Sequence, residues 1–143
     1  MMNRLHKKNY MVSLNVEFNF YQNTAALVKT SYHIPFDVTG TQNTALNFLQ
    51  CFHANNCIEL YHGRIYTCTI IPHSKHFAKY FDIKLHECEF DSIDIHTAKN
   101  LQEILGFLAR PVPFCRYCNV LGRTFGHPWK QSKKEIEEWT IKQ

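Results

Sequence analysis

Residues 57–68 read CIELYHGRIYTC, and this stretch predicts a β-hairpin. Apolar residues precede and follow the sequence YHG, in which Gly63 can supply the positive φ angle that a tight turn requires. A cysteine stands at each end of the stretch, Cys57 and Cys68. Because a hairpin brings its two ends together, we expect these thiols to lie near each other, with Cys51 a short way upstream.

A second cysteine pair lies in PVPFCRYCN, residues 111–119. Two thiolates at CxxC spacing on a turn can bind one metal ion or cluster, and the same spacing also serves redox dithiols. A thioredoxin-like dithiol would open a helix, whereas this pair runs into glycines. If the turn folds back onto the base of the hairpin, up to five thiols meet there: Cys51, Cys57, Cys68, Cys115 and Cys118. The sixth thiol, Cys88, has no partner at ligand spacing.

Composition narrows the class of protein. The 143 residues carry 16 basic and 12 acidic side chains, and the basic ones are scattered, which gives no indication of nucleic-acid binding. No stretch approaches the ~20 apolar residues that a membrane span requires, and the start has no sustained apolar region typical of a signal peptide. We therefore expect a cytoplasmic protein. Disulfides are uncommon there, so six cysteines favour metal or cluster binding.

The remaining patterns predict a small α+β domain with a β-hairpin and two to four helices around the cysteines. Residues 11–18 alternate as a strand does. The clearest helix is NLQEILGFLARP, residues 100–111, with a capping box at Asn100 and Glu103. Its predicted buried residues are Leu101, Ile104, Leu105 and Leu108. Three shorter helices are expected at residues 44–52 (capped by Thr44, with Leu46, Leu49 and Phe52 on one face), 73–81 and 132–139, the last capped by Ser132 and Glu135.

The cysteine pattern resembles a known family. Cys51, eleven residues, Gly63, four residues and Cys68 match C-x(9–15)-G-x(4)-C, and a later CxxC completes the pattern. This is similar to the SPASM domain and its shorter twitch form, the auxiliary iron–sulfur domains that follow the barrel of many radical SAM enzymes. The similarity covers roughly residues 36–140, including Trp129 and KKEIEEW after the CxxC. Its anchors are Gly40, Gln42, Cys51, Gly63, Cys68, Cys115 and Cys118.

One motif of these enzymes is missing. The CxxxCxxC loop that holds the S-adenosylmethionine-cleaving cluster does not occur in the chain. The resemblance therefore implies a C-terminal piece that is not catalytic alone, with a radical SAM core that is encoded separately or lost. It also implies that residues 1–35 are a lead-in or the end of the barrel, and that residues 36–143 form the cluster domain.

The resemblance implies one [4Fe–4S] cluster held by Cys51, Cys68, Cys115 and Cys118, with Cys57 as a substitute for Cys51. Its role would be electron transfer or substrate positioning. Four thiolates suit zinc equally, so a zinc-stabilised interaction module stays open, as do plain buried thiols. His53, His62 and His127 lie near the ligands in sequence, and each is either a hydrogen-bond partner of the centre or an exposed polar side chain.

Overall fold

The chain builds two small antiparallel sheets and four helices, in a computed structural model that describes residues 30–128 and 130–141. The predicted strand at residues 11–18, most of the lead-in segment and Trp129 lie outside the described residues. One sheet has two strands and the other has three. Their bounds are β1 (Thr30–His33) with β5 (Thr124–Pro128), and β2 (Glu59–Tyr61), β3 (Arg64–Tyr66) and β4 (Ser92–Asp94). The α+β class is confirmed.

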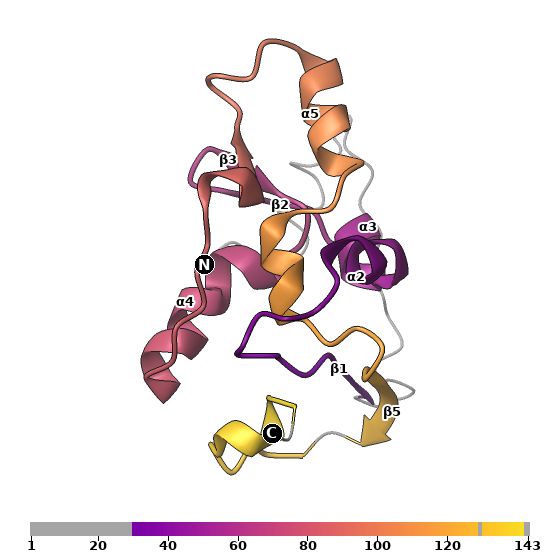
Figure 1. Cartoon of the computed structure of the whole chain (residues 1–143), viewed down its shortest axis with the longest axis vertical. Coiled ribbons are helices and arrows are strands. Elements are labelled where there is room, and N and C mark those ends of the chain that lie inside the picture. Colours follow the sequence, from indigo (N-terminus) through magenta and orange to yellow (C-terminus); the bar gives the residue numbers. More distant parts are fainter. Residues whose placement is uncertain (1–29, 129, 142–143) are drawn as a thin grey trace, which may run out of the picture.

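The described helices lie around the three-stranded sheet and below it (Figure 1). They are α2 (Thr44–Gln50), α3 (Phe52–Asn56), α4 (Ile70–Phe81) and α5 (Leu101–Leu108), with short 3-10 turns η1 (Glu89–Asp91), η2 (Pro113–Tyr117) and η3 (Ile136–Glu138). None of these described helices has the length and apolar character needed to cross a lipid bilayer.

The predicted hairpin is present as β2 and β3. Tyr61 pairs with Arg64, so only His62 and Gly63 form the turn, and both have positive φ (48° and 74°). This is the backbone of a tight turn whose twist matches that of the strands. Strand β4 extends the sheet by pairing Ile93 with Ile65.

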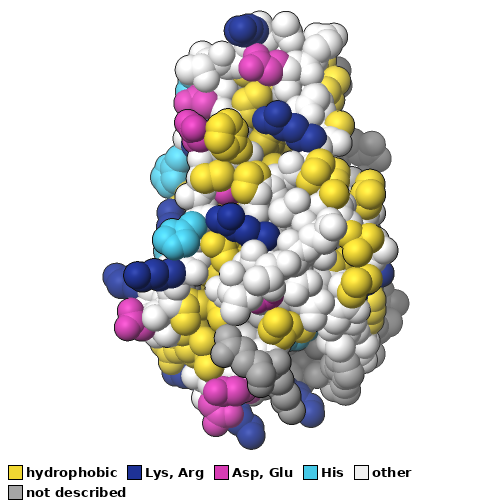
Figure 2. Space-filling view, in the orientation of Figure 1, with side chains coloured by type: hydrophobic (Ala, Val, Ile, Leu, Met, Phe, Trp, Pro, Cys, Tyr) yellow, Lys and Arg dark blue, Asp and Glu magenta, His cyan; other side chains and the backbone are white. Residues whose placement is uncertain are grey.

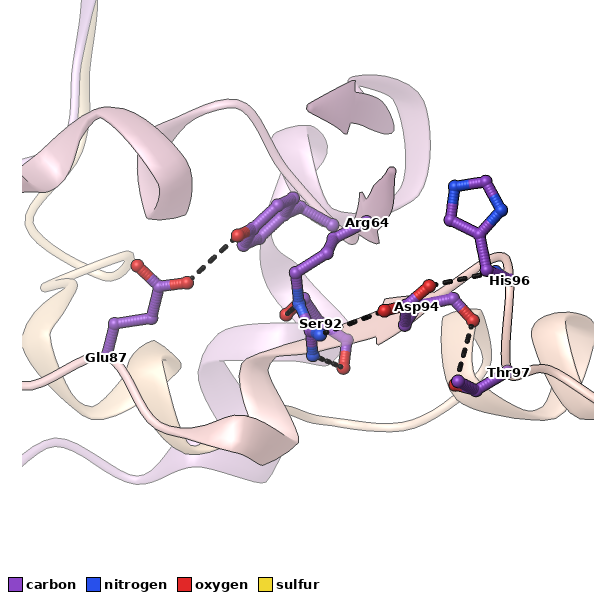
Figure 3. Close-up of polar contacts among 7 residues, drawn as sticks. Arg64, Glu87, Ser92, Asp94, His96 and Thr97 are labelled. Atoms are coloured by element: carbon purple, nitrogen blue, oxygen red, sulfur yellow. Dashed lines mark hydrogen bonds and ion pairs between the residues drawn. The ribbon is translucent and has the colours of Figure 1, made fainter. Parts of the chain in front are cut away.

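Polar contacts hold β3 to its neighbours (Figure 3). Arg64 Nε donates to Ser92 Oγ at 2.7 Å, and its guanidinium lies 3.7 Å from the Asp94 carboxylate. The Tyr66 hydroxyl donates to Glu87 at 3.0 Å. The Arg64 contacts hold the end of β3 at the turn, and the Tyr66 bond holds the end that leads through Thr67 to Cys68.

The N-cap of α2 is one residue earlier than predicted. The cap is Asn43, whose side-chain oxygen accepts from the Leu46 amide at 2.9 Å, rather than Thr44. The predicted apolar face is also wrong, because Leu49 is 76% exposed and the buried side chains are Asn47 and Phe48. The helix therefore turns a polar side chain toward the interior.

The capping of α5 by Asn100 is confirmed, since its side chain accepts from the Glu103 amide at 3.0 Å. The predicted buried face is wrong for Leu101 and Leu105, which are more than half exposed. Ile104 and Leu108 are partly buried, Leu108 against the core, and the fully buried side chain is Phe107. The reason is position, because α5 stands at the top of Figure 1, where among the described elements mainly β4 lies against it.

The predicted helix at residues 132–139 is reduced to the single 3-10 turn η3. Ser132 does not cap it through Glu135. Instead the Ser132 hydroxyl and the Lys133 amide both donate to the Glu138 carboxylate, at 2.6 and 3.0 Å. These bonds close a loop between Ser132 and Glu138, which takes the place of the predicted helix.

The core has two parts that share the segment 112–120. The first packs Tyr66, Ile71 and Phe107 against Val112, Phe114 and Tyr117. The second packs Phe48, Cys51 and Ala54 against Cys118 and Val120. In Figure 1 this segment (orange) runs between α4 on one side and α2 and α3 on the other. The turn η2 is therefore the centre of the fold.

Apolar side chains also reach the surface. In Figure 2 they gather over α2 and α3, where Leu46, Leu49 and Phe52 are 39%, 76% and 60% exposed. Charged side chains lie among the other apolar ones on this face.

Candidate metal centre

Four of the six cysteines line one small cavity in the middle of the molecule: Cys51, Cys68, Cys115 and Cys118. They come from three separate parts of the chain. Cys51 sits at the junction of α2 and α3, Cys68 lies between β3 and α4, and the CxxC pair belongs to η2 and its end. The structure thus brings the base of the hairpin and the CxxC turn together, as the sequence predicts.

The other two cysteines lie elsewhere. Cys57 is half-buried at the end of α3, where its amide donates to the His53 carbonyl at 2.9 Å. Cys88 stands before η1. Neither is among the described residues that line the cavity. Of the two predicted alternatives, Cys51 is therefore the thiol at the cavity and Cys57 is not.

The cavity disfavours negative charge on the thiols of Cys68, Cys115 and Cys118. Burial raises the pKa of Cys68 to about 12 and that of Cys115 to about 11, and it raises the pKa of Cys118 well above the ordinary value. Charge on the neighbouring sulfurs raises these pKa values further, so the thiols lie close enough to interact. Thiolates in this cavity need a cation or a cationic cluster core to compensate them.

Backbone amides oppose part of this effect. The amides of Ile70 and Ile71, in the first turn of α4, donate to the Cys68 sulfur and act to lower its pKa. The Val112 amide does the same for Cys115. The first amides of a helix have no partner within the helix and carry partial positive charge, so they suit a thiolate.

Asn47 ties the CxxC turn to α2. Its side-chain amide donates to the main-chain oxygens of Cys115, at 2.8 Å, and of Cys118. Asn47 is 4% exposed and lines the cavity. No pattern in the sequence distinguishes Asn47, because α2 carries a second amide side chain, Gln50, which is exposed.

The loop before α2 also binds the CxxC turn, through the two residues that lie between Cys115 and Cys118. The main-chain amide of Asp37 donates to the main-chain oxygen of Tyr117 at 2.7 Å, and the main-chain amide of Gln42 donates to that of Arg116 at 3.2 Å. Gly40 has a φ of 66° and lies against the Tyr117 ring, where an added Cβ would stand 2.7 Å from Cε1. The two anchors of the resemblance at Gly40 and Gln42 therefore support the CxxC turn.

Asp37 organises that loop. Its fully buried carboxylate accepts hydrogen bonds from the amides and hydroxyls of Thr39 and Thr41 and from the Gln42 side chain. Burial acts to raise the pKa of Asp37, but the hydrogen bonds from Thr39, Gln42 and Thr41 outweigh it and hold the pKa well below its usual range. Asp37 is thus a charged, hydrogen-bonded support for the segment that carries Cys115 and Cys118.

Thr67 is the second polar side chain at the cavity. It is fully buried, it directly precedes Cys68, and its hydroxyl has no hydrogen-bond partner among the described residues. A buried hydroxyl without a partner is costly, so its position calls for an explanation.

The predicted histidines do not line the cavity in the described structure. His62 forms the hairpin turn, at the far end of the hairpin from Cys68, and packs against the Tyr61 ring. His53 lies in α3, where burial lowers its pKa. The side chain of His127 lies outside the described residues.

The four thiols share the cavity without forming a compact coordination shell. Among residues 30–128 and 130–141, no three side chains of His, Cys, Asp or Glu are arranged to hold a metal ion. Tetrahedral zinc with Zn–S bonds of ~2.3 Å requires sulfurs ~3.8 Å apart. A cluster of several irons takes thiolates that are spaced more widely.

Comparison of the chain with family profiles, with curated proteins and with solved structures finds no match. The candidate centre therefore stands on the residues and their geometry.

Proposed function

We propose that this domain binds an iron–sulfur cluster, [4Fe–4S], through Cys51, Cys68, Cys115 and Cys118. The observation that supports this most strongly is that four thiols, carried by three separate segments, line one buried cavity. Four cysteine ligands are what such clusters require. No disulfide joins two of the described cysteines, which fits a reducing compartment such as the cytoplasm.

The surroundings of the cavity also suit a cluster. The amides at the start of α4 and near η2 donate to sulfur, and Asn47 and the loop around Asp37 fix the CxxC turn. Hydrogen bonds to sulfur and limited access to water are among the factors that set the reduction potential of a cluster in a protein.

By its resemblance to SPASM and twitch domains, the chain would serve as the auxiliary-cluster part of a radical SAM protein. In that setting a cluster held by the four cysteines would accept an electron from the substrate or help to position it. The partner would be a radical SAM core that carries the CxxxCxxC loop. Alone, the chain should release no 5′-deoxyadenosine from S-adenosylmethionine and dithionite.

The direct test is anaerobic purification followed by assays for iron, acid-labile sulfide and zinc. We expect about four irons and four sulfides per chain. One zinc per chain, with neither iron nor sulfide, would instead support the zinc-stabilised interaction module.

Two serine variants test the ligands. Cys68→Ser should lose the cluster, because it removes a sulfur from the cavity. Cys88→Ser should retain it, because Cys88 stands before η1 and not at the cavity. Full iron and sulfide content in both variants would contradict the ligand set.

A further inference from the structure

We propose that the Thr67 hydroxyl donates a hydrogen bond to a sulfur atom of the bound centre, either a cysteine thiolate or an inorganic sulfide, and so raises the reduction potential of the centre. This inference rests on the proposed function. It adds Thr67, as a residue that sets the reduction potential, to the four cysteines that hold the centre.

Thr67 lies beside the four thiols. It follows β3 directly and precedes Cys68, and it lines the same cavity as all four thiols. Its side chain is fully buried, and its Oγ1 has no hydrogen-bond partner among the described residues. The hydroxyl is therefore a buried donor without a partner, carried by a residue that lines the cavity.

The cavity offers this hydroxyl few acceptors. The other residues that line the cavity are apolar, apart from the cysteines and Asn47, whose side-chain amide is engaged with the CxxC turn. Sulfur is thus the main acceptor that the cavity offers. A neutral thiol accepts weakly, whereas a thiolate or sulfide accepts strongly, so the bond forms when the centre is bound.

This hydrogen bond would change the reduction potential of the centre. Reduction adds one negative charge to a cluster, so a hydrogen bond to sulfur stabilises the reduced form more than the oxidised form. Removing the hydroxyl should therefore make the potential more negative.

The experiment compares the cluster-loaded wild-type chain with three variants under anaerobic conditions. Thr67→Val keeps the shape of the side chain and removes the hydroxyl, and Thr67→Ser keeps the hydroxyl. Thr69→Val is the matched control, because Thr69 flanks Cys68 on its other side but is exposed and makes no capping bond through its side chain. Each protein is titrated with dithionite while the reduced cluster is followed by electron paramagnetic resonance.

We expect Thr67→Val to disfavour reduction about tenfold, a shift of about 59 mV to more negative potential for a one-electron couple. Thr67→Ser and Thr69→Val should stay near the wild-type potential. Resonance Raman spectra should show an iron–sulfur band that shifts in D2O for the wild type and shifts less for Thr67→Val. If Thr67→Val does not retain iron, Thr67→Ala takes its place in both measurements.

Two results would overturn the inference, and they are distinguishable. A cluster that loads fully in every protein but has one common potential would remove the role of Thr67 and leave the proposed function intact. A wild-type chain without iron and sulfide would remove both.

Discussion

The side-chain amide of Asn47 donates to the main-chain oxygen of Cys115, 68 residues away in sequence, and also to that of Cys118. One buried side chain of α2 therefore holds both ends of the CxxC turn. Its neighbour in the chain, Phe48, packs in the same core part as Cys51 and Cys118. Folding of α2 and placement of three of the four thiols are thus coupled.

This coupling predicts the effect of Asn47→Ala. The variant removes the side-chain donor to two main-chain oxygens, of which that of Cys115 keeps the Cys118 amide at 3.3 Å, and should lower the free energy of unfolding by about 1–3 kcal/mol. It should also speed the loss of iron, because the CxxC turn is no longer fixed. Urea denaturation and the decay of the visible absorption of the cluster measure the two effects.

Gln50→Ala is the control for Asn47→Ala. Gln50 lies in the same helix but is exposed, so its removal should change stability by less than about 0.5 kcal/mol. Equal effects of the two substitutions would mean that the bonds to the turn contribute nothing.

A second prediction separates Cys51 from Cys57. Cys51→Ser should lose most of the cluster, because Cys51 lines the cavity, whereas Cys57→Ser should keep it, because Cys57 sits at the end of α3. Iron and sulfide content per chain measures the difference. The reverse result would assign the fourth ligand to Cys57.

A third prediction concerns pH and Asp37. The pKa of Asp37 is lower in the folded chain than in the unfolded one, where it is about 3.9. The ionised carboxylate therefore adds stability above about pH 4, and this contribution is lost as the pH falls toward the folded pKa. Asp37→Asn should thus destabilise the metal-free chain by about 1.5–3 kcal/mol at pH 7.

The same difference should shrink steadily as the pH falls below about 4, where the carboxylate becomes protonated. Urea denaturation of both proteins between pH 7 and pH 2.5 measures it. A difference that is constant over this range would show that the charge of Asp37 has no part in the effect.

The fourth prediction concerns Gly40. Both Gly40 and Gly126 have a positive φ (66° and 70°), so alanine at either position is strained by about 1–2 kcal/mol. Only at Gly40 does the new Cβ also meet the Tyr117 ring, at 2.7 Å. Gly40→Ala should therefore destabilise the chain by at least about 1 kcal/mol more than Gly126→Ala.

Thermal denaturation of the two variants gives this comparison, because the backbone strain is shared. If the two melting temperatures agree, the ring contact is not a constraint on the loop. A lower iron content in Gly40→Ala alone would further link the loop to the metal centre.

Local patterns in the sequence predicted the local structure well where one short stretch carries the information. The turn at His62 and Gly63, the cap at Asn100 and the strand pairing of β2 with β3 each depend on neighbouring residues. The apolar faces of α2 and α5 were predicted wrongly, because burial depends on what a helix meets. Leu105 is more than half exposed, whereas Asn47 is buried and its side chain donates a hydrogen bond to the CxxC turn.

The sequence by itself determined the hairpin, the α+β class and the spacing of the cysteines, since backbone preferences and separations along the chain are local properties. The resemblance favoured Cys51 over Cys57, but only the tertiary structure placed Cys51 at the cavity, and only it placed Asn47 and Thr67 beside the thiols. The physical reason is that these neighbours are brought together by packing around η2 from segments far apart in sequence. No pattern within one segment encodes which side chain of another segment it will meet.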